Sequence, residues 1–185
     1  MLNQDLIIQG CIKGDRRAQK SLYEHFYGKM MVVCMRYANC KDEALDMFQE
    51  AFIKVFKNLP KYGKKGSFEG WVRRIMVNTC IDHIRKNKIN NQMVELESNH
   101  GSIEIDEDKD AGILEYVGFN DLLDMVQLLS PAYRSVFNLY IVDGFTHQEI
   151  ANALGISVGT SKSNLAKAKV NLKKMLLKKI EKMAG

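Results

Sequence analysis

The sequence predicts an all-α protein made of two small helical domains that are joined by a flexible acidic linker. Three observations support this fold class. Only Pro60 and Pro131 interrupt a sequence that otherwise favours helices. Apolar residues recur at spacings of three and four, whereas no stretch alternates as a strand would. Residues 88–115 are rich in acids and amides and poor in large apolar groups, which is typical of a linker.

Length, charge and cysteine usage exclude several classes of protein. The 185 residues are enough for one or two small domains. No signal-peptide pattern and no run of about 18 apolar residues occurs, so we expect a cytoplasmic protein without membrane insertion. The four cysteines form no CxxC pair and no ligand spacing with the four histidines, which favours reduced, mostly buried thiols over a zinc site. We therefore expect no metal and no cofactor. A net charge of +5 favours a polyanionic partner.

We expect the first domain to cover residues 1–87. Its helices are predicted from apolar periodicity and from the breakers Gly14, Gly28 and Pro60. A basic loop follows Pro60, and Ser67 is a suitable cap for the helix after it. The predicted helices of this domain cover 5–13, 16–27, 30–38, 42–59 and 68–86.

The helix predicted over 42–59 has one apolar side that is suited to burial. Its opposite side carries two acids, an amide, an aliphatic residue and one lysine at helical spacing, namely Asp46, Gln49, Glu50, Ile53 and Lys57. A solvated face more usually mixes acids with lysines. We interpret this side as a candidate docking surface, with an ordinary solvated face as the alternative.

The helix predicted over 68–86 is basic, and it follows the basic loop 61–65. From Lys61 to Lys88 eight basic residues stand against two acids. Charge and amide contacts of this kind can hold single-stranded or distorted DNA. Trp71 is expected in the core. The candidate DNA-binding residues of this helix are Arg73, Arg74, Asn78, Asp82, Arg85 and Lys86.

The predicted linker, residues 88–115, reverses the charge of its neighbours. It contains eight acids and two lysines, whereas residues 162–182 contain eight lysines and one acid. So few apolar groups cannot offset the entropy of ordering the segment, which predicts flexibility. Two interpretations stay open: a solvated spacer, or a segment that enters a basic channel of a partner.

The second domain is expected to cover residues 116–185 and to contain a helix-turn-helix. Ser130 and Pro131 start a helix that is predicted to reach about Val142. Thr146 and Glu149 form a capping box, and Gly155 suits the turn that follows. Ser157 then caps a long basic helix. These signals agree with a DNA-binding helix-turn-helix, the alternative being a basic helical hairpin.

Short polar side chains and lysines are predicted to face outward from the start of this last helix. Short polar groups can reach base edges while lysines contact phosphates. The candidate DNA-binding residues are Thr160, Lys162, Ser163, Asn164 and Lys167.

Three stretches taken together resemble a known family. The first is the array of Asp46, Gln49, Glu50 and Phe52 with the Lys-Val-Phe that follows, the second is residues 67–86, and the third is residues 129–169. Their order and separation are similar to those of bacterial RNA polymerase sigma factors of the extracytoplasmic-function (ECF) group. The resemblance covers nearly the whole chain, and three motifs at the right separations are more specific than any one of them.

The resemblance implies a role for each array. The first would dock on the clamp helices of the largest subunit of core RNA polymerase through Asp46, Gln49, Glu50 and Ile53. The second would open promoter DNA at the −10 element, and the third would read the −35 element. Such factors are commonly held inactive by an anti-sigma factor, so the resemblance also implies that partner.

The sequence departs from the family pattern at the head of the last helix. The usual Thr-Val is Thr160-Ser161 here, which places a hydroxyl on an inward position. The common arginines appear as Asn164, Lys167 and Lys169. Lysine cannot make arginine's two-pronged contact to guanine, so we expect a different promoter preference and binding weighted toward phosphates.

The sequence therefore predicts a sigma factor that directs core RNA polymerase to specific promoters and is not itself an enzyme. No nucleophile-base pair, phosphate loop or metal cluster is apparent. Two alternatives stay open. A stand-alone helix-turn-helix transcriptional regulator would not need the face of Asp46, Gln49 and Glu50. An enzyme acting on nucleic acid would need clustered acids, which only the linker offers.

Overall fold

The computed structural model describes residues 4–90 and 119–184, and within these residues every regular element is helical. The chain divides into two compact units, residues 1–86 and 87–185. The prediction of an all-α fold is confirmed. Most of the predicted linker, 88–115, lies outside the described residues. None of the described helices has the length and apolar character needed to cross a membrane.

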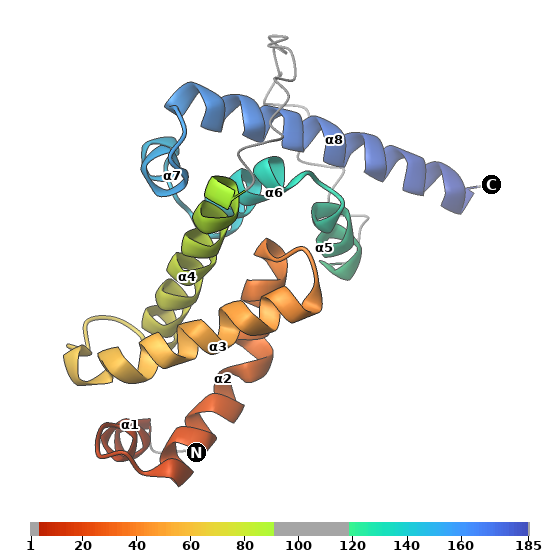
Figure 1. The fold of residues 1–185 in the computed structure, drawn as a ribbon. Coiled ribbons are helices and arrows are strands. Elements are labelled where there is room, and N and C mark those ends of the chain that lie inside the picture. Colours follow the sequence, from red (N-terminus) through yellow and green to blue (C-terminus); the bar gives the residue numbers. More distant parts are fainter. Residues whose placement is uncertain (1–3, 91–118, 185) are drawn as a thin grey trace. The chain divides into compact units, whose positions relative to one another are not determined.

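The first unit begins with α1 (Gln4–Ile12), α2 (Arg16–Tyr37) and α3 (Lys41–Asn58) (Figure 1). A short 3-10 turn, η1 (Leu59–Lys61), and a loop lead into α4 (Phe68–Asn90). α2 packs against both α1 and α3. Helix α4 continues to Asn90, beyond the end that the sequence predicted.

Helix α2 runs without interruption through Gly28, where the sequence predicted a break. Its buried residues include Leu22, Phe26, Met30 and Cys34, which recur every four residues on both sides of the glycine. A glycine inside a helix costs about 1 kcal/mol relative to alanine, which burial of several large side chains easily exceeds. The prediction of two helices here was wrong because a local breaker signal was given more weight than a continuous apolar stripe.

The core of the first unit is built around the apolar side of α3. Phe48 and Phe52 are buried, and the ring of Tyr23 from α2 meets each of them edge-on at 5.1 Å. Met47 is buried too. Burial of this side leaves the opposite side of α3 toward solvent, which positions the candidate docking surface.

The second unit contains α5 (Phe119–Gln127), α6 (Pro131–Phe137), η3 (Asn138–Val142), α7 (His147–Leu154) and α8 (Val158–Ala184). α5, α6 and α7 all pack against the long helix α8 (Figure 1). The single helix predicted from Pro131 to about Val142 is α6 followed by one π-helical turn, η3. That widened turn carries Tyr140, which lies against α7.

Both ends of α7 and the start of α8 have the predicted local chemistry. Thr146 and Glu149 form the capping box, with the Thr146 side chain accepting from the Glu149 N–H. Gly155 adopts φ +62°, a left-handed conformation that favours glycine. The Ser157 hydroxyl accepts from the Thr160 N–H at 2.9 Å. These caps set the start of α8, where the candidate DNA-binding residues lie.

Candidate functional site

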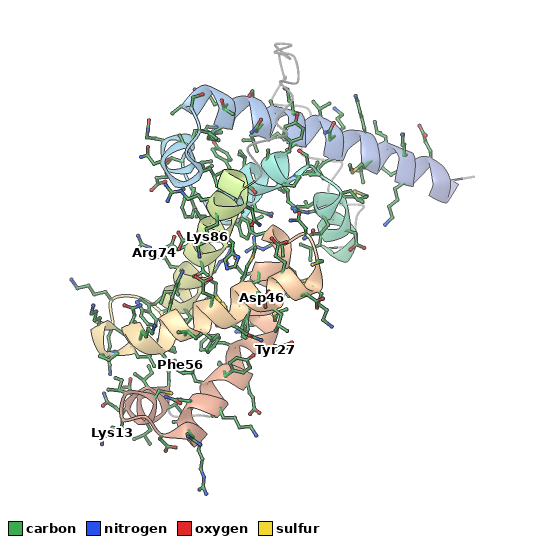
Figure 2. The ribbon with its side chains drawn as sticks, in the orientation of Figure 1. Lys13, Tyr27, Asp46, Phe56, Arg74 and Lys86 are labelled. Carbon is green, nitrogen blue, oxygen red and sulfur yellow. The ribbon has the colours of Figure 1, made fainter. Side chains whose placement is uncertain are left out.

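The solvent side of α3 exposes three of the four predicted docking residues. The side chains of Asp46 and Gln49 are exposed, and 54% of Ile53 is accessible. Figure 2 shows Asp46 on this helix. An exposed isoleucine beside a carboxylate and an amide offers an apolar contact with polar neighbours that can fix its orientation.

Glu50, the fourth predicted docking residue, is half-buried and has partners within the unit. Its Oε1 lies 3.0 Å from Lys54 Nζ, one helical turn further along α3. Its Oε2 lies 2.7 Å from His83 Nε2 of α4, and Lys86 Nζ lies 4.0 Å from Oε1. Both carboxylate oxygens are therefore engaged inside the protein.

Asp82, predicted to contact DNA, is engaged in the same way. Its Oδ2 lies 3.1 Å from Lys54 Nζ, so the lysine bridges Glu50 of its own helix and Asp82 of α4. We call Glu50, Lys54, Asp82, His83 and Lys86 the α3–α4 ion network. An acid on a surface that meets DNA would repel phosphate, and Lys54 neutralises this one.

The pKa values of Glu50 and Lys54 are shifted in the directions that favour their charged forms. The hydrogen bond from Lys54 lowers the pKa of Glu50. Burial raises that pKa, and the hydrogen bond to His83 lowers it again, so that the net shift is downward. Burial alone would lower the pKa of Lys54, but its hydrogen bonds to Glu50 and Asp82 outweigh burial and raise it. Both groups therefore keep their charge over a wide pH range.

The exposed side of α4 presents basic and amide side chains. Arg74, Asn78, Arg85 and Lys86 are exposed, whereas Arg73 is half-buried. Positions 74, 78 and 85 share one side of the helix, because their spacings of four and seven residues approximate whole turns. Figure 2 labels Arg74 and Lys86 on this helix.

An aromatic cluster supports the basic loop that precedes α4. Trp71 stacks on Phe68 with ring centroids 5.6 Å apart and lies 5.2 Å from Tyr62. The Tyr62 hydroxyl donates to the Gly66 carbonyl at 3.2 Å, which closes the loop. Lys64 has φ 52°, an uncommon left-handed conformation for a residue other than glycine. Trp71 packs against the buried Phe68 but is itself half-buried, so it lies at the edge of the core rather than within it, where the sequence predicted it.

The first turns of α8 carry the residues predicted to read duplex DNA. Thr160, Lys162 and Ser163 are exposed, and Asn164 and Lys167 are half-buried. The Ser163 hydroxyl donates to the Thr160 carbonyl at 3.1 Å, and the Thr160 and Ser157 hydroxyls lie 2.9 Å apart. Local partners therefore restrain the two hydroxyl side chains while leaving them accessible.

The inward hydroxyl of Ser161 has a specific partner. Ser161 is fully buried, and its Oγ lies 2.9 Å from Nδ1 of His147 at the start of α7. The His147 ring stacks on Tyr140 with centroids 4.4 Å apart. Burial lowers the pKa of His147, and the positive charges of Lys162 and Lys169 lower it further. A neutral imidazole therefore gives the buried Ser161 hydroxyl a hydrogen-bond partner.

Sequence reasoning missed the residues that hold these surfaces in place. The pairing of Lys54 with Glu50 could have been predicted, since Lys54 lies four residues after Glu50 on the same helix. The contacts of His83 and His147 could not have been predicted, because their partners lie far away in the sequence. Among the described residues no group of three or more His, Cys, Asp or Glu side chains is arranged to hold a metal ion.

Both units match known protein families. Residues 22–89 match Sigma-70 region 2, and residues 119–172 match Sigma-70, region 4. The ECF RNA polymerase sigma factor SigW of Bacillus subtilis is 29% identical over 171 residues, which span 89% of this chain and 91% of that protein. The ECF RNA polymerase sigma-E factor of Escherichia coli K12 is 25% identical over 179 residues, 91% of each chain.

A solved structure is similar along most of its length. The sigma factor RpoE, crystallised with the anti-sigma factor NepR from Bartonella quintana, has a TM-score of 0.48 and 20% identity. The matched part covers 86% of this chain and 96% of that one.

The chain belongs to the sigma-70 family of transcription initiation factors, with its region 2 in the first unit and its region 4 in the second. Within that family it is an ECF sigma factor, and such factors direct RNA polymerase to promoters. The resemblance found in the sequence is confirmed. A stand-alone helix-turn-helix regulator is not favoured, because region 2 accounts for residues 22–89.

Proposed function

We propose that this sigma factor docks on core RNA polymerase through α3 and on promoter DNA through α4 and α8. The exposed face of α3 supports the docking role, because Ile53 stands in solvent beside Asp46 and Gln49. The clamp helices of the largest polymerase subunit are the proposed partner. Glu50 belongs to the same face, and its engaged carboxylate fits a supporting role better than direct contact.

The stripe on α4 is proposed to capture the −10 element. Arg73, Arg74, Arg85 and Lys86 supply positive charge, and the exposed amide of Asn78 can pair with an unstacked base. Energy for opening the duplex would come from binding the exposed strand, so no catalytic group is required. Asp82 completes the predicted set, and its pairing with Lys54 suits a structural role.

The start of α8 is proposed to enter the major groove at the −35 element. Thr160, Ser163 and Asn164 are short polar side chains near its N-terminus, and Lys162 and Lys167 are placed for phosphate contacts. The absence of arginine at these five positions of the sequence favours binding weighted toward phosphates.

The proposed domains are residues 1–87 and 116–185, with 88–115 as a linker between them. Two tethered modules bind one promoter more tightly than either alone, because the second binding event becomes intramolecular. The factor would act in the cytoplasm with polymerase, as a protein without catalytic activity. The family resemblance supports an anti-sigma factor as its inhibitor.

Run-off transcription with core polymerase on a promoter library tests the proposal. The full chain should direct initiation to a specific subset of promoters. Asp46→Arg combined with Ile53→Asp should abolish co-purification with core polymerase, whereas Glu181→Arg, a charge reversal on the exposed side of α8, should not. Initiation at the same sites without the chain, or full polymerase binding by the double variant, would contradict the proposal.

A further inference from the structure

Three side-chain contacts join α3 to the second half of α4. Lys54 Nζ lies 3.1 Å from Asp82 Oδ2, His83 Nε2 lies 2.7 Å from Glu50 Oε2, and Lys86 Nζ lies 4.0 Å from Glu50 Oε1. The Lys54–Glu50 pair within α3 connects the first two contacts. All five residues thus belong to one connected set rather than to separate surface pairs.

The first half of α4 is fixed by different means. Phe68, at its start, is buried and lies 5.7 Å from the ring of Phe26 on α2. Glu69 pairs with Lys29 of α2 at 2.8 Å. Apolar packing and an ion pair on α2 therefore anchor the beginning of α4. Its later turns combine buried apolar residues, among them Val77, Cys80 and Ile81, with the α3–α4 ion network, which joins them to α3.

The network lies between the two surfaces that this sigma factor is proposed to use. Glu50 and Lys54 follow Asp46 and Gln49 along α3, and Asp82 and His83 lie between Asn78 and Arg85 along α4. Exposed ion pairs are individually weak, but members of a network that share partners are coupled, so loss of one member affects the others. With side-chain exposures of 34% for Lys54 and 21% for His83, these groups are partly shielded from water.

The chemistry of Glu50 and Asp82 also favours an internal role. A carboxylate on a DNA-binding stripe opposes phosphate binding unless a cation neutralises it. Both oxygens of Glu50 already have partners, so a direct contact to polymerase would have to compete with Lys54 and His83. Their place in the network gives both acids a function that needs no contact with polymerase or DNA.

We propose that Lys54 and His83 are positioning residues, which hold the DNA-capturing side of α4 in a fixed orientation on the polymerase-docking helix α3 through Glu50 and Asp82. The consequence rests on the proposed function: docking of α3 on polymerase would set the place at which α4 meets the −10 element. The coupling of α4 to α3 does not depend on polymerase, because it is inferred from distances within the first unit.

Amide hydrogen exchange on the full chain tests the coupling without polymerase. Asp82→Asn and Lys54→Met should each lower the protection factors of amides in residues 76–86 by about 3- to 10-fold, since local opening becomes easier. The double variant should be no worse than the more affected single variant, because both remove the same interaction. Lys54→Arg, which keeps the positive charge, should retain most of the amide protection of the parent chain.

The matched control is the pair of Lys20 and Glu24, which are exposed and lie in a single helix 3.8 Å apart. Lys20→Met should leave the protection of residues 76–86 unchanged. Multiplicative effects of Asp82→Asn and Lys54→Met, or unchanged protection in both, would overturn the coupling whatever the protein does with polymerase.

A second measurement tests the positioning role with core polymerase and promoter DNA. Asp82→Asn should lower the fraction of open complexes about 3- to 10-fold, while the affinity for polymerase changes by less than about 2-fold. Lys54→Arg should open promoters as well as the parent chain does. Unchanged opening by Asp82→Asn, while the exchange coupling is present, would overturn the positioning role. Failure of the parent chain to open any promoter would refute the proposed function and leave the coupling intact.

Discussion

The two units hold their proposed DNA-binding helices by different polar contacts, which accompany buried apolar residues in both. In the first unit a charged network joins the later turns of α4 to α3, in addition to buried apolar residues such as Met76 and Cys80. In the second unit α8 is held by buried apolar residues such as Leu165 and Leu172 and by a neutral contact from Ser161 to His147. Salt screens ionic contacts, whereas it does not screen apolar packing or a neutral hydrogen bond. We therefore expect α4 to be the more adjustable of the two helices.

The largest effect is expected from removing a core side chain of the second unit. Ile150 of α7 is fully buried. Ile150→Ala should lower the free energy of unfolding of that unit by about 2–5 kcal/mol through lost burial and a cavity. Thermal unfolding by circular dichroism would measure this. Trp71 is the single tryptophan and lies in the first unit, so unfolding followed by its fluorescence is the control. An equal drop in the unfolding temperature seen by fluorescence would contradict the expectation that the substitution destabilises only the second unit.

A smaller loss is expected at the turn of the second unit. Gly155 has φ +62°, and no heavy atom would obstruct an added Cβ. Gly155→Ala should therefore cost only the left-handed backbone strain, about 1 kcal/mol, measured by the same unfolding experiment. Gly28→Ala is the matched control: it lies within α2, also has open space, and should be neutral or stabilising. Equal changes in the free energy of unfolding for the two substitutions would refute the claim that the left-handed conformation of Gly155 requires glycine.

The charged network should make the stability of the first unit depend on pH. The pKa of Glu50 is held below its ordinary value of 4.5, so its contribution is present above about pH 4.5 and is lost as the pH falls through the folded-state pKa. The pKa of Lys54 is raised above 10.5, so its contribution is lost only as the pH rises through that higher value. Glu50→Gln should flatten the acid side of the profile.

Denaturant unfolding followed by Trp71 fluorescence at a series of pH values would measure this dependence. Glu24→Gln, an exposed acid of α2, is the control and should leave the profile unchanged. An acid limb that is the same in Glu50→Gln and in the parent chain would show that the network does not contribute to stability.

The smallest effect concerns the neutral contact in the second unit. Burial and the charges of Lys162 and Lys169 keep the pKa of His147 below 6.5, so its contribution to stability is present above about pH 6.5 and lost as the pH falls through the folded-state value. Lys162→Ala should raise the pKa of His147 toward its ordinary value, which NMR titration of the ring would detect. Lys178→Ala, further along α8, should not change it.

Local signals predicted the helices well because a helix is defined by contacts within four residues. The capping box at Thr146, the left-handed turn at Gly155 and the cap at Ser157 were all identified from neighbouring residues, and each is present. Met47 shares the spacing of the other core residues of α3 and could have been found in the same way. Gly28 shows the limit, since its propensity alone did not reveal that both sides of α2 share one buried stripe.

The sequence by itself determined the helical fold class, the caps and turns, and membership of the sigma-70 family, because these follow from periodicity and from motifs at fixed separations. Only the tertiary structure decided which polar side chains meet. Lys54 and Asp82 are 28 residues apart, and His147 and Ser161 are 14 apart. Such pairs depend on how helices cross, and the crossing is set by the packing of apolar sides, which no local pattern of polar residues records.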